Sequence, residues 1–586
     1  MAEKIAKLMN DSPLARWSAL LLVALMMFFG YMFVDVMSPI ESLLEAERGW
    51  SPSVFGTYAA GEYILNVCGF LILAGIILDK MGIRFTGTLS ASLMLLGAII
   101  KLVGVNDWFQ TTGFCEWLNT WWVSMPGSAK MSALGFMIFG CGCEMAGITV
   151  SRTIAKWFEG KEMALAMGLE MAIARVGVFS VFSISPVIAK SFGTIVAPVA
   201  FCTLLLLIGL IFFLVFCVMD KKFDKQLGKD ANANTNADSE EEFKISDIGK
   251  IFGSKIFWVI ALLCVLYYSA IFPFQRYGAN MLQCNLGIDA TTASNIFRWF
   301  PIGAAIITPF LGAFLDNKGK GATMLIWGSL LLICCHLIFA FIVPATGSRL
   351  IAYATIVILG ISFALVPAAL WPSVPKVMNP RYLGSAYSLI FWVQNIGLCF
   401  VPMLIGNVLA SSNSDNQIVQ DTKTFVEQYQ ETTLAMDRDA VAFDSCYDNL
   451  ATTYDKIAKT YSSLTEDQKT AAVSNTYTAV VNTMQTLDAR KEAICNYIET
   501  HPAKEQQQAG FFDFLKKNKA SAETSELDQY REEIGKHSSA IFVPYRFTVP
   551  LILFASFGII AFFIALYLKL IDKKNNYGLE EPNIKK

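Results

Sequence analysis

The chain has 586 residues, of which 54% are hydrophobic and only 16% charged, and its formal net charge is −2. Soluble globular proteins carry about 25% charged residues, so we expect most of this surface to avoid water. There is no basic excess and no nucleic-acid motif, which argues against a nucleic-acid partner. The thirteen cysteines and three histidines lack zinc-ligand spacing, so we expect no metal site and no cofactor.

Apolar runs of about 20 residues, the length that crosses a bilayer as a helix, recur along the chain. The first run is too long for the apolar core of a cleavable signal peptide, so we expect it to span the membrane. Six runs precede a polar break and six follow it, which predicts an all-α membrane protein of twelve transmembrane helices in two six-helix bundles. The predicted spans are 17–40, 53–78, 83–104, 131–156, 162–187, 193–218, 256–281, 290–315, 321–343, 349–375, 382–409 and 541–571.

Two polar segments interrupt the spans. Residues 219–255 are charged and poor in apolar side chains, which is typical of a flexible linker. Residues 410–540 are polar but carry apolar residues at helical spacing, which predicts a helical insertion between the last two spans. The predicted parts are a first bundle (1–218), a linker (219–255), helices 7–11 of the second bundle (256–409), the insertion (410–540), and helix 12 with its tail (541–586).

Basic residues in the short loops predict the orientation. Lysine and arginine gather in alternate loops, together with both termini, and such loops face the cytoplasm. The insertion is then extracytoplasmic, where disulfides persist. The sequence allows either a disulfide between Cys446 and Cys495 or two free thiols. The insertion contains no N-glycosylation sequon, so we favour a bacterial inner membrane. Binding of a protein partner to the insertion, or self-association through it, is also open.

A short motif occurs once in each half. A glycine, an aspartate and a second glycine keep the same spacing, followed by a basic residue, after the second span of each half. Glycine allows close helix approach, and an aspartate at a helix end can pair with a base or cap the next helix. The two copies are Gly75, Asp79, Gly82 and Arg84, and Gly312, Asp316, Gly319 and Lys320.

This repeated motif resembles the signature of the major facilitator superfamily. The resemblance covers nearly all of the chain outside 410–540, and it implies two pseudo-symmetric bundles that rock about a central cavity. It also implies gating roles at the cytoplasmic side for Asp79, Arg84 and Asp316. Residues 156–177 and 369–398 are similar to the branch of this superfamily that includes lysosomal dipeptide uniporters. We therefore expect a transporter and not an enzyme.

Charged residues inside spans are costly and mark candidate sites. Glu144 in span 4 and Arg175 in span 5 lie 15 residues on either side of the predicted turn at Glu159–Gly160. At about 1.5 Å per residue both would lie roughly 22 Å from that turn, near mid-membrane. They could bind the amine and carboxylate of a zwitterion, or form an ion pair that locks the two spans together.

Spans 10 and 11 carry further candidates for substrate contact. Trp371 precedes two prolines that we expect to break the helix and to provide a hinge. Polar side chains in span 11 should face protein or cavity, either as contacts between helices or as substrate ligands. These four candidates are Trp371, Tyr387, Gln394 and Asn395.

Four other charges are predicted to lie in the outer halves of the bundles. Asp35 and Glu62 belong to the first bundle, and Arg276 and Arg298 to the second. Opposite signs on opposing bundles indicate an extracytoplasmic gate of ion pairs, unless some of these residues face water in the loops. Lys101 and Arg152 are expected to reach the membrane surface or to pair locally, and we expect His336 to be a packed core residue.

Three functions remain open at this stage. The first is transport of dipeptides or similar zwitterions by alternating access, as uniport or coupled to protons. The second keeps the same fold but carries an organic anion or sugar acid. The third is a non-transporting receptor or scaffold that uses the 410–540 insertion. The first fits the candidate residues best, and its predicted partners are a small solute and the lipid bilayer.

Overall fold

The computed structural model describes residues 8–158, 161–226, 245–378, 383–436, 438–500, 526–538 and 540–582. Within these ranges the regular structure is helical and no strand occurs. Eleven helical segments of the described chain are long and apolar enough to cross a membrane. The predicted turn at Glu159–Gly160 and residues 227–244 of the predicted linker lie outside the described ranges. The protein is therefore an all-α, multi-pass membrane protein.

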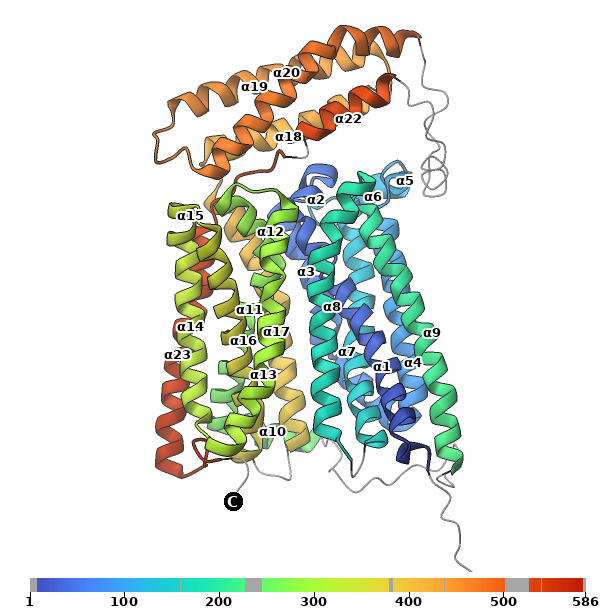
Figure 1. Cartoon of the computed structure of the whole chain (residues 1–586), viewed down its shortest axis with the longest axis vertical. Helices are drawn as coiled ribbons and strands as arrows, with labels where there is room; N and C mark the ends of the chain where they lie inside the picture. The colour runs from blue at the N-terminus through green and yellow to red at the C-terminus, as the bar shows by residue number, and fades with distance from the viewer. Residues whose placement is uncertain are drawn as a thin grey trace, which may run out of the picture.

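The first half of the membrane region, residues 8–226, is the blue-to-cyan bundle of Figure 1. One of its segments, Pro52–Val105, has 54 residues, about twice the length that one crossing needs. It breaks at Gly82, whose φ of 74° is a left-handed conformation that favours glycine. The helices of this half are α1 (Pro13–Val34), α2 (Glu41–Arg48), α3 (Pro52–Leu65), α4 (Leu71–Val105), α5 (Asp107–Gln110), α6 (Gly113–Thr120), α7 (Gly127–Trp157), α8 (Met163–Phe192) and α9 (Val196–Gln226).

The second half comprises residues 245–412 and 540–582 and packs beside the first (Figure 1). Its first helix, α10, begins inside the predicted linker, and α9 also continues beyond the predicted start of that linker. The helices of this half are α10 (Ile245–Phe252), α11 (Lys255–Leu286), α12 (Ala290–Phe297), α13 (Trp299–Lys318), α14 (Gly321–Leu337), α15 (Val343–Thr346), α16 (Arg349–Val377), α17 (Leu383–Ser412) and α23 (Thr548–Asn575).

Helix α16 corrects one prediction. It runs without a break through Pro367, Pro372 and Pro375, so the expected helix break after Trp371 is wrong. Each proline removes one backbone hydrogen bond and crowds the preceding turn. In apolar surroundings, however, the other backbone groups are satisfied only if the helix continues.

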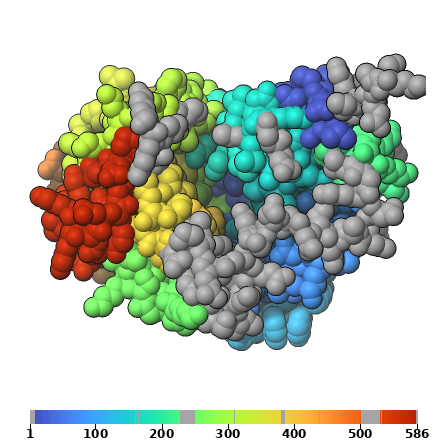
Figure 2. Space-filling view, turned by 90° about the horizontal axis from the view of Figure 1, so that it is seen from below, coloured from blue at the N-terminus to red at the C-terminus, as the bar shows by residue number. Residues whose placement is uncertain are grey.

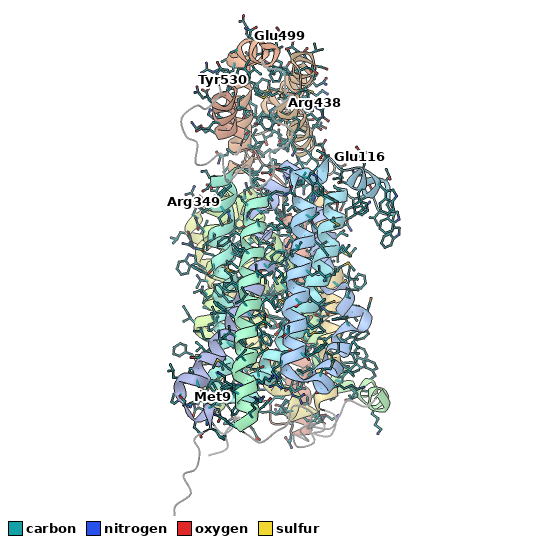
Figure 3. All side chains as sticks on the ribbon, turned by 90° about the vertical axis from the view of Figure 1, so that its right-hand side faces the viewer. Met9, Glu116, Arg349, Arg438, Glu499 and Tyr530 are labelled. Atoms are coloured by element: carbon teal, nitrogen blue, oxygen red, sulfur yellow. The ribbon has the colours of Figure 1, made fainter. Side chains whose placement is uncertain are left out.

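Four helices of the 410–540 segment lie across one end of the membrane bundles (Figures 1 and 3). We call this the capped end and the opposite end, where Met9 lies (Figure 3), the terminal end. Cys446 and Cys495 are both free thiols, which is the second of the two alternatives that the sequence allowed. The four helices are α18 (Gln417–Ala435), α19 (Ala440–Ser463), α20 (Ala471–Thr500) and α22 (Glu526–Ser538).

The insertion and the stretch of chain that follows it contact the ends of the membrane helices. The last predicted span starts late, because the chain is not helical before Thr548. In that non-helical stretch the buried Tyr545 hydroxyl donates to Glu45 of α2 in the first half. Burial, and then the nearby Glu45 carboxylate, raise the pKa of Tyr545 well above its usual value, so the hydroxyl stays a donor. On α20, the Asn475 amide donates to the Gly287 carbonyl of the second half.

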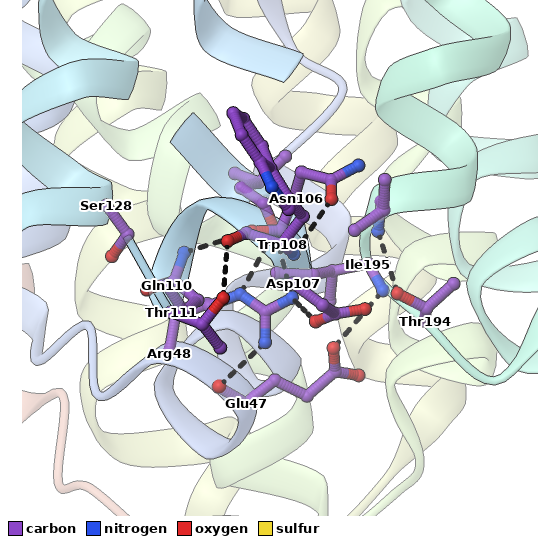
Figure 4. Close-up of polar contacts among 12 residues, drawn as sticks. Glu47, Arg48, Asn106, Asp107, Trp108, Gln110, Thr111, Ser128, Thr194 and Ile195 are labelled. Atoms are coloured by element: carbon purple, nitrogen blue, oxygen red, sulfur yellow. Dashed lines mark hydrogen bonds and ion pairs between the residues drawn. The ribbon is translucent and has the colours of Figure 1, made fainter. Parts of the chain in front are cut away.

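The short helices at the capped end of the first half are held by α2 (Figure 4). The Arg48 guanidinium donates to the Val105 carbonyl at 2.9 and 3.1 Å and forms a salt bridge with Asp107. The neighbouring Glu47 carboxylate accepts a hydrogen bond from the backbone N–H of Ile195 at 3.3 Å. Helix α2 therefore bonds to the end of α4, to the start of the short helix α5 and to the residue before α9 at this surface.

Candidate functional site

A buried charge cluster joins the two halves towards the capped end. Arg276 of α11 donates from Nη1 to the Val34 carbonyl at 2.6 Å and to Asp35 Oδ1 at 2.8 Å. Its Nη2 forms a salt bridge with Glu62 of α3. Gln275 Nε2 donates to the second Asp35 oxygen at 2.6 Å. The three charged side chains are at most 8% exposed, so the structure brings together three of the four residues predicted to lie there.

Neutral contacts between the halves accompany this cluster. The Tyr277 hydroxyl lies 3.0 Å from the Pro52 carbonyl oxygen of the first half and 3.2 Å from that of Pro402 in the second. Ser294 of α12 donates to the Phe182 carbonyl of α8. From the terminal end, by contrast, Figure 2 shows a hollow between the blue-to-cyan first half and the yellow and green second half.

Arg298, the fourth predicted member, lies elsewhere. Its Nη1 donates to the Ser183 hydroxyl of α8 at 3.3 Å, and its guanidinium stacks near the rings of Phe179 and Trp299, 5.2 and 5.8 Å from their centroids. Among the described residues it forms no salt bridge, so the expected ion pair is wrong for this arginine. Its contacts in the described chain are a hydroxyl and two aromatic rings rather than a carboxylate.

Arg175 of α8 reaches from the first half to the second. Its Nη1 donates to the Thr308 hydroxyl of α13 at 3.2 Å, and its guanidinium lies 5.0 Å from the ring centroid of Phe363 on α16. A guanidinium carries five N–H donors, and this hydrogen bond uses one of them. No carboxylate lies within salt-bridge distance in the described part of the chain, so most of its hydrogen-bonding capacity is unused.

Glu144 of α7 is half-buried and has neither a hydrogen bond nor an ion pair among the described residues. It therefore does not form the ion pair that would lock α7 to α8. Glu144 and Arg175 nevertheless share one tyrosine. The Tyr31 side chain of α1 lies in electrostatic range of Glu144 and of Arg175. Tyr31 also lies in range of Glu170, a half-buried acid on α8.

Glu170 was not predicted from the sequence. It stands within the apolar run Met163–Phe192, so the general rule that intramembrane charges are functional candidates would have identified it. The charges in electrostatic range of Tyr31 are thus those of Glu144, Glu170, Glu62 and Arg175, and of the three carboxylates only Glu62 forms a salt bridge in the described chain, with Arg276.

An aromatic cluster in the second half lies next to Arg175. Trp371 donates from Nε1 to the Tyr268 hydroxyl at 3.0 Å, and the Tyr387 hydroxyl donates to the Trp371 carbonyl at 3.0 Å. The Phe391 ring stacks on Trp371 at 4.6 Å. Tyr268 is itself in electrostatic range of Arg175, so the predicted residues Trp371 and Tyr387 lie in the same region as the guanidinium.

The two polar candidates of span 11 are buried in α17. The Cys264 thiol of α11 donates to the Gln394 side-chain oxygen at 3.4 Å, a polar contact between neighbouring helices. Asn395 is 3% exposed. Neither side chain faces lipid, as the sequence predicted, and both the structural role and the substrate role fit this placement.

The motif residues of the first half pair within that half at the terminal end. Asp79 forms a salt bridge with Arg152. Arg84 pairs with Asp224 at 2.6 Å and with Asp220 at 3.3 Å. The expected local pairing of Arg152 is confirmed, and none of these bonds joins the two halves.

The second copy of the motif shares the positive φ at its second glycine. Gly319 has a φ of 72°, which matches the 74° of Gly82 in the first copy, and only glycine adopts this conformation at little cost. Asp316 lies in the last turn of α13. The chain after α23 folds back here, and the Glu580 side chain accepts a hydrogen bond from the backbone N–H of Thr323 at 2.7 Å.

Lys101 of α4 contradicts its prediction. It does not reach the membrane surface, because its side chain is fully buried. Its ammonium lies 4.3 Å from the ring centroid of Phe33 and 4.5 Å from that of Phe136, on two neighbouring helices. These rings surround the ammonium and leave it no path to water.

Comparison with known proteins identifies similar sequences. The family model described as Major Facilitator Superfamily matches residues 20–402. The lysosomal dipeptide transporter MFSD1 of Danio rerio is 28% identical over 349 residues, which cover 58% of this chain and 68% of that protein. The protein of the same name from Homo sapiens is 25% identical over 415 residues, covering 69% and 82%.

Solved structures agree at the level of the fold. A bacterial homologue of the human lysosomal transporter Spinster, in an inward-facing and unoccupied conformation, superposes with a TM-score of 0.52 at 14% identity, covering 95% of this chain and 98% of that one. The nucleoside transporter NupG gives a TM-score of 0.51 at 14% identity, covering 76% and 99%. At these identities the likeness concerns the fold alone.

Proposed function

Because this chain belongs to the Major Facilitator Superfamily and is a transporter rather than an enzyme, we propose that it carries dipeptides or similar zwitterions by alternating access. The observation that supports this most directly is that Arg175 and Glu144 are charges of opposite sign without a counter-ion in the described chain. They lie near one tyrosine, in two helices of the first half. The names of the similar sequences, lysosomal dipeptide transporters, point to the same substrate class.

The proposed ligand chemistry follows from the hydrogen-bonding groups of Arg175 and Glu144 that have no partner among the described residues. The free N–H groups of Arg175 suit the carboxylate end of a peptide, since guanidinium and carboxylate form two parallel hydrogen bonds. Glu144 accepts the amino terminus, and Glu170 adds a second negative charge on the same side. Two carboxylates against one guanidinium favour a ligand with an amine over a simple organic anion or sugar acid, because complementary charge decides which ligand is accepted.

The second half supplies the remaining contacts in this proposal. Trp371 and Tyr387 present aromatic surface to the side chains of the peptide, which suits a carrier that accepts many sequences. Gln394 and Asn395 are assigned to hydrogen bonds with the peptide amide. Since these residues belong to the second half and Arg175 to the first, a dipeptide bound to both sets would contact both halves.

Alternating access assigns roles to the charged residues at the two ends. Arg276, with Asp35 and Glu62, closes the capped end while the cavity opens at the terminal end, and Arg298 contributes through its contact with α8. Asp79, Arg84 and Asp316 are assigned to the opposite state, in which the terminal end closes. The distribution of basic loops supports a cytoplasmic terminal end, the lack of a sequon in 410–540 favours a bacterial inner membrane, and the proposal covers both uniport and proton coupling.

A binding experiment tests the substrate site. The purified protein, Arg175→Ala and Glu144→Gln are melted in the presence of dipeptides, free amino acids and organic acids. A ligand at 100 times its Kd stabilises by about 2.7 kcal/mol, so dipeptides should raise the melting temperature of the unmodified protein and not that of Arg175→Ala. Arg490→Ala, a change in the insertion remote from the site, should keep the full response.

Two outcomes would contradict the proposal. Full stabilisation of Arg175→Ala by dipeptides would reject the site. Equal stabilisation of the unmodified protein by carboxylic acids that lack an amine would reject the zwitterion and favour an organic anion.

A further inference from the structure

The buried lysine on α4 has an unusual environment. Lys101 is fully buried, and its ammonium has no hydrogen-bond partner. Three aromatic rings surround it, those of Phe33, Phe136 and Tyr58, with centroids 4.3, 4.5 and 5.1 Å from Nζ. Aromatic faces attract a cation, but they do not replace the hydrogen bonds that water would provide. A buried ammonium is normally paired, and this one has no such partner among the described residues.

Carboxylates are nearby but already occupied. Asp35 and Glu62 lie in electrostatic range of Lys101, and both are bonded to Arg276. The Arg276 guanidinium lies over the same Phe136 ring as Lys101, 5.6 Å from its centroid. One buried cluster thus holds two cations and two carboxylates.

The members of this cluster belong to different halves of the protein. Lys101, Asp35 and Glu62 belong to the first half, on α4, at the end of α1 and on α3. Arg276 alone belongs to the second half, on α11. If the halves separate at the capped end, Arg276 leaves with the second half, and the two carboxylates remain with Lys101.

We propose that Lys101 is the replacement counter-ion of Asp35 and Glu62, which it pairs with when the capped end opens and Arg276 withdraws. This inference rests on the alternating-access function proposed above. The aromatic rings hold the ammonium beside the carboxylates while Arg276 occupies them. Lysine suits the role because its ammonium is a compact charge on a flexible four-carbon stem with rotatable donors.

The role explains why a cation is retained at this position. In the closed state Arg276 alone satisfies both acids, and an apolar side chain of similar size would fill the space between the rings with less desolvation. In the open state, however, two neighbouring carboxylates without a cation would repel each other. Lys101 is therefore a positioning residue for transport that acts through Asp35 and Glu62, not a substrate contact.

The test changes the number of positive and negative charges in the cluster. Lys101→Met, Lys101→Arg and the double variant Lys101→Met/Glu62→Gln are reconstituted without substrate. Hydrogen–deuterium exchange is followed in peptides that cover 34–48 and 271–286 at the capped end. Lys101→Met should slow this exchange at least about tenfold by disfavouring the open state, since a tenfold change in an equilibrium is less than half of what a lost buried counter-ion costs. Lys101→Arg should stay within about twofold, because it keeps the charge.

The double variant separates this role from simple packing. Removing one carboxylate together with the lysine leaves a single acid, so Lys101→Met/Glu62→Gln should recover most of the exchange and of the solute flux lost in Lys101→Met. If Lys101→Met does not fold, as judged by its melting curve, Lys101→Gln takes its place with similar length and no charge. Unchanged exchange in the neutral variants, or a double variant no faster than the single one, would overturn the inference.

The readout is independent of the substrate assignment. The exchange experiment contains no solute, so it remains valid if dipeptides prove not to be carried. Exchange that follows the charge balance while dipeptide flux is absent would support the role of Lys101 and reject the proposed substrate.

Discussion

Removing the arginine that joins the two halves should open the capped end. In Arg276→Met the carboxylates of Asp35 and Glu62 lose their partner from the second half. Removing one partner of a buried ion pair costs about 3–5 kcal/mol, and we take about 3 kcal/mol here because Lys101 stays as a cation beside them. At about 1.4 kcal/mol per factor of ten, the closed-to-open ratio at the capped end should fall by roughly 150-fold.

Hydrogen–deuterium exchange of the capped-end peptides measures this ratio without a ligand. Arg298→Met is the matched control, since it also removes an arginine that contacts the opposite half but breaks one hydrogen bond to Ser183 and no ion pair. It should change exchange by no more than about tenfold, as expected for one hydrogen bond. Equal exchange in the Arg276 and Arg298 variants would refute the reasoning, because the salt bridges would then contribute no more than a single neutral contact.

Two further changes address the same end of the molecule. A Cβ at Gly56 would meet the Pro402 carbonyl of the other half, whereas one at Gly75 would meet nothing within 4 Å. Gly56→Ala should therefore speed exchange at the capped end and slow transport, and Gly75→Ala should leave exchange at the capped end unchanged. Tyr545→Phe leaves the Glu45 carboxylate buried without its donor, which should destabilise the protein by about 1–3 kcal/mol and lower its melting temperature. An unchanged melting curve would mean that this contact does not hold the stretch before α23 on α2.

The architecture was predictable because segments that lie in lipid are apolar over the length of a membrane helix. Long apolar runs predicted the membrane helices, and the polar composition of 410–540 predicted a helical segment outside them. Helix ends were less predictable: α9 continues to Gln226 and α23 begins only at Thr548. Ends depend on where neighbouring helices and loops cover the backbone, which composition does not record.

The pairing of charges was predictable only in part. Opposite signs in the outer spans predicted that Arg276 would meet Asp35 and Glu62, because buried charges need partners. Arg298 instead reaches a serine. Which neighbour a side chain meets depends on how its helix is rotated, and a helix that is apolar on all faces gives no periodic signal of that rotation.

Lys101 shows a second limit of sequence reasoning. Its position near the end of α4 suggested access to water, but three aromatic rings from other helices cover the ammonium. These rings come from distant parts of the sequence, so no local pattern predicts the enclosure. The bond from Arg175 to Thr308 was not predictable for the same reason.

Counterflow of a labelled dipeptide into proteoliposomes tests the central claim most directly. Vesicles loaded with unlabelled dipeptide should accumulate the label when they contain the unmodified protein. Those with Arg175→Ala should accumulate no more than protein-free vesicles, while its capped-end exchange stays normal. Accumulation by Arg175→Ala at the unmodified rate would contradict the account, since a carrier that does not need the Arg175 guanidinium does not recognise the carboxylate of its solute through it.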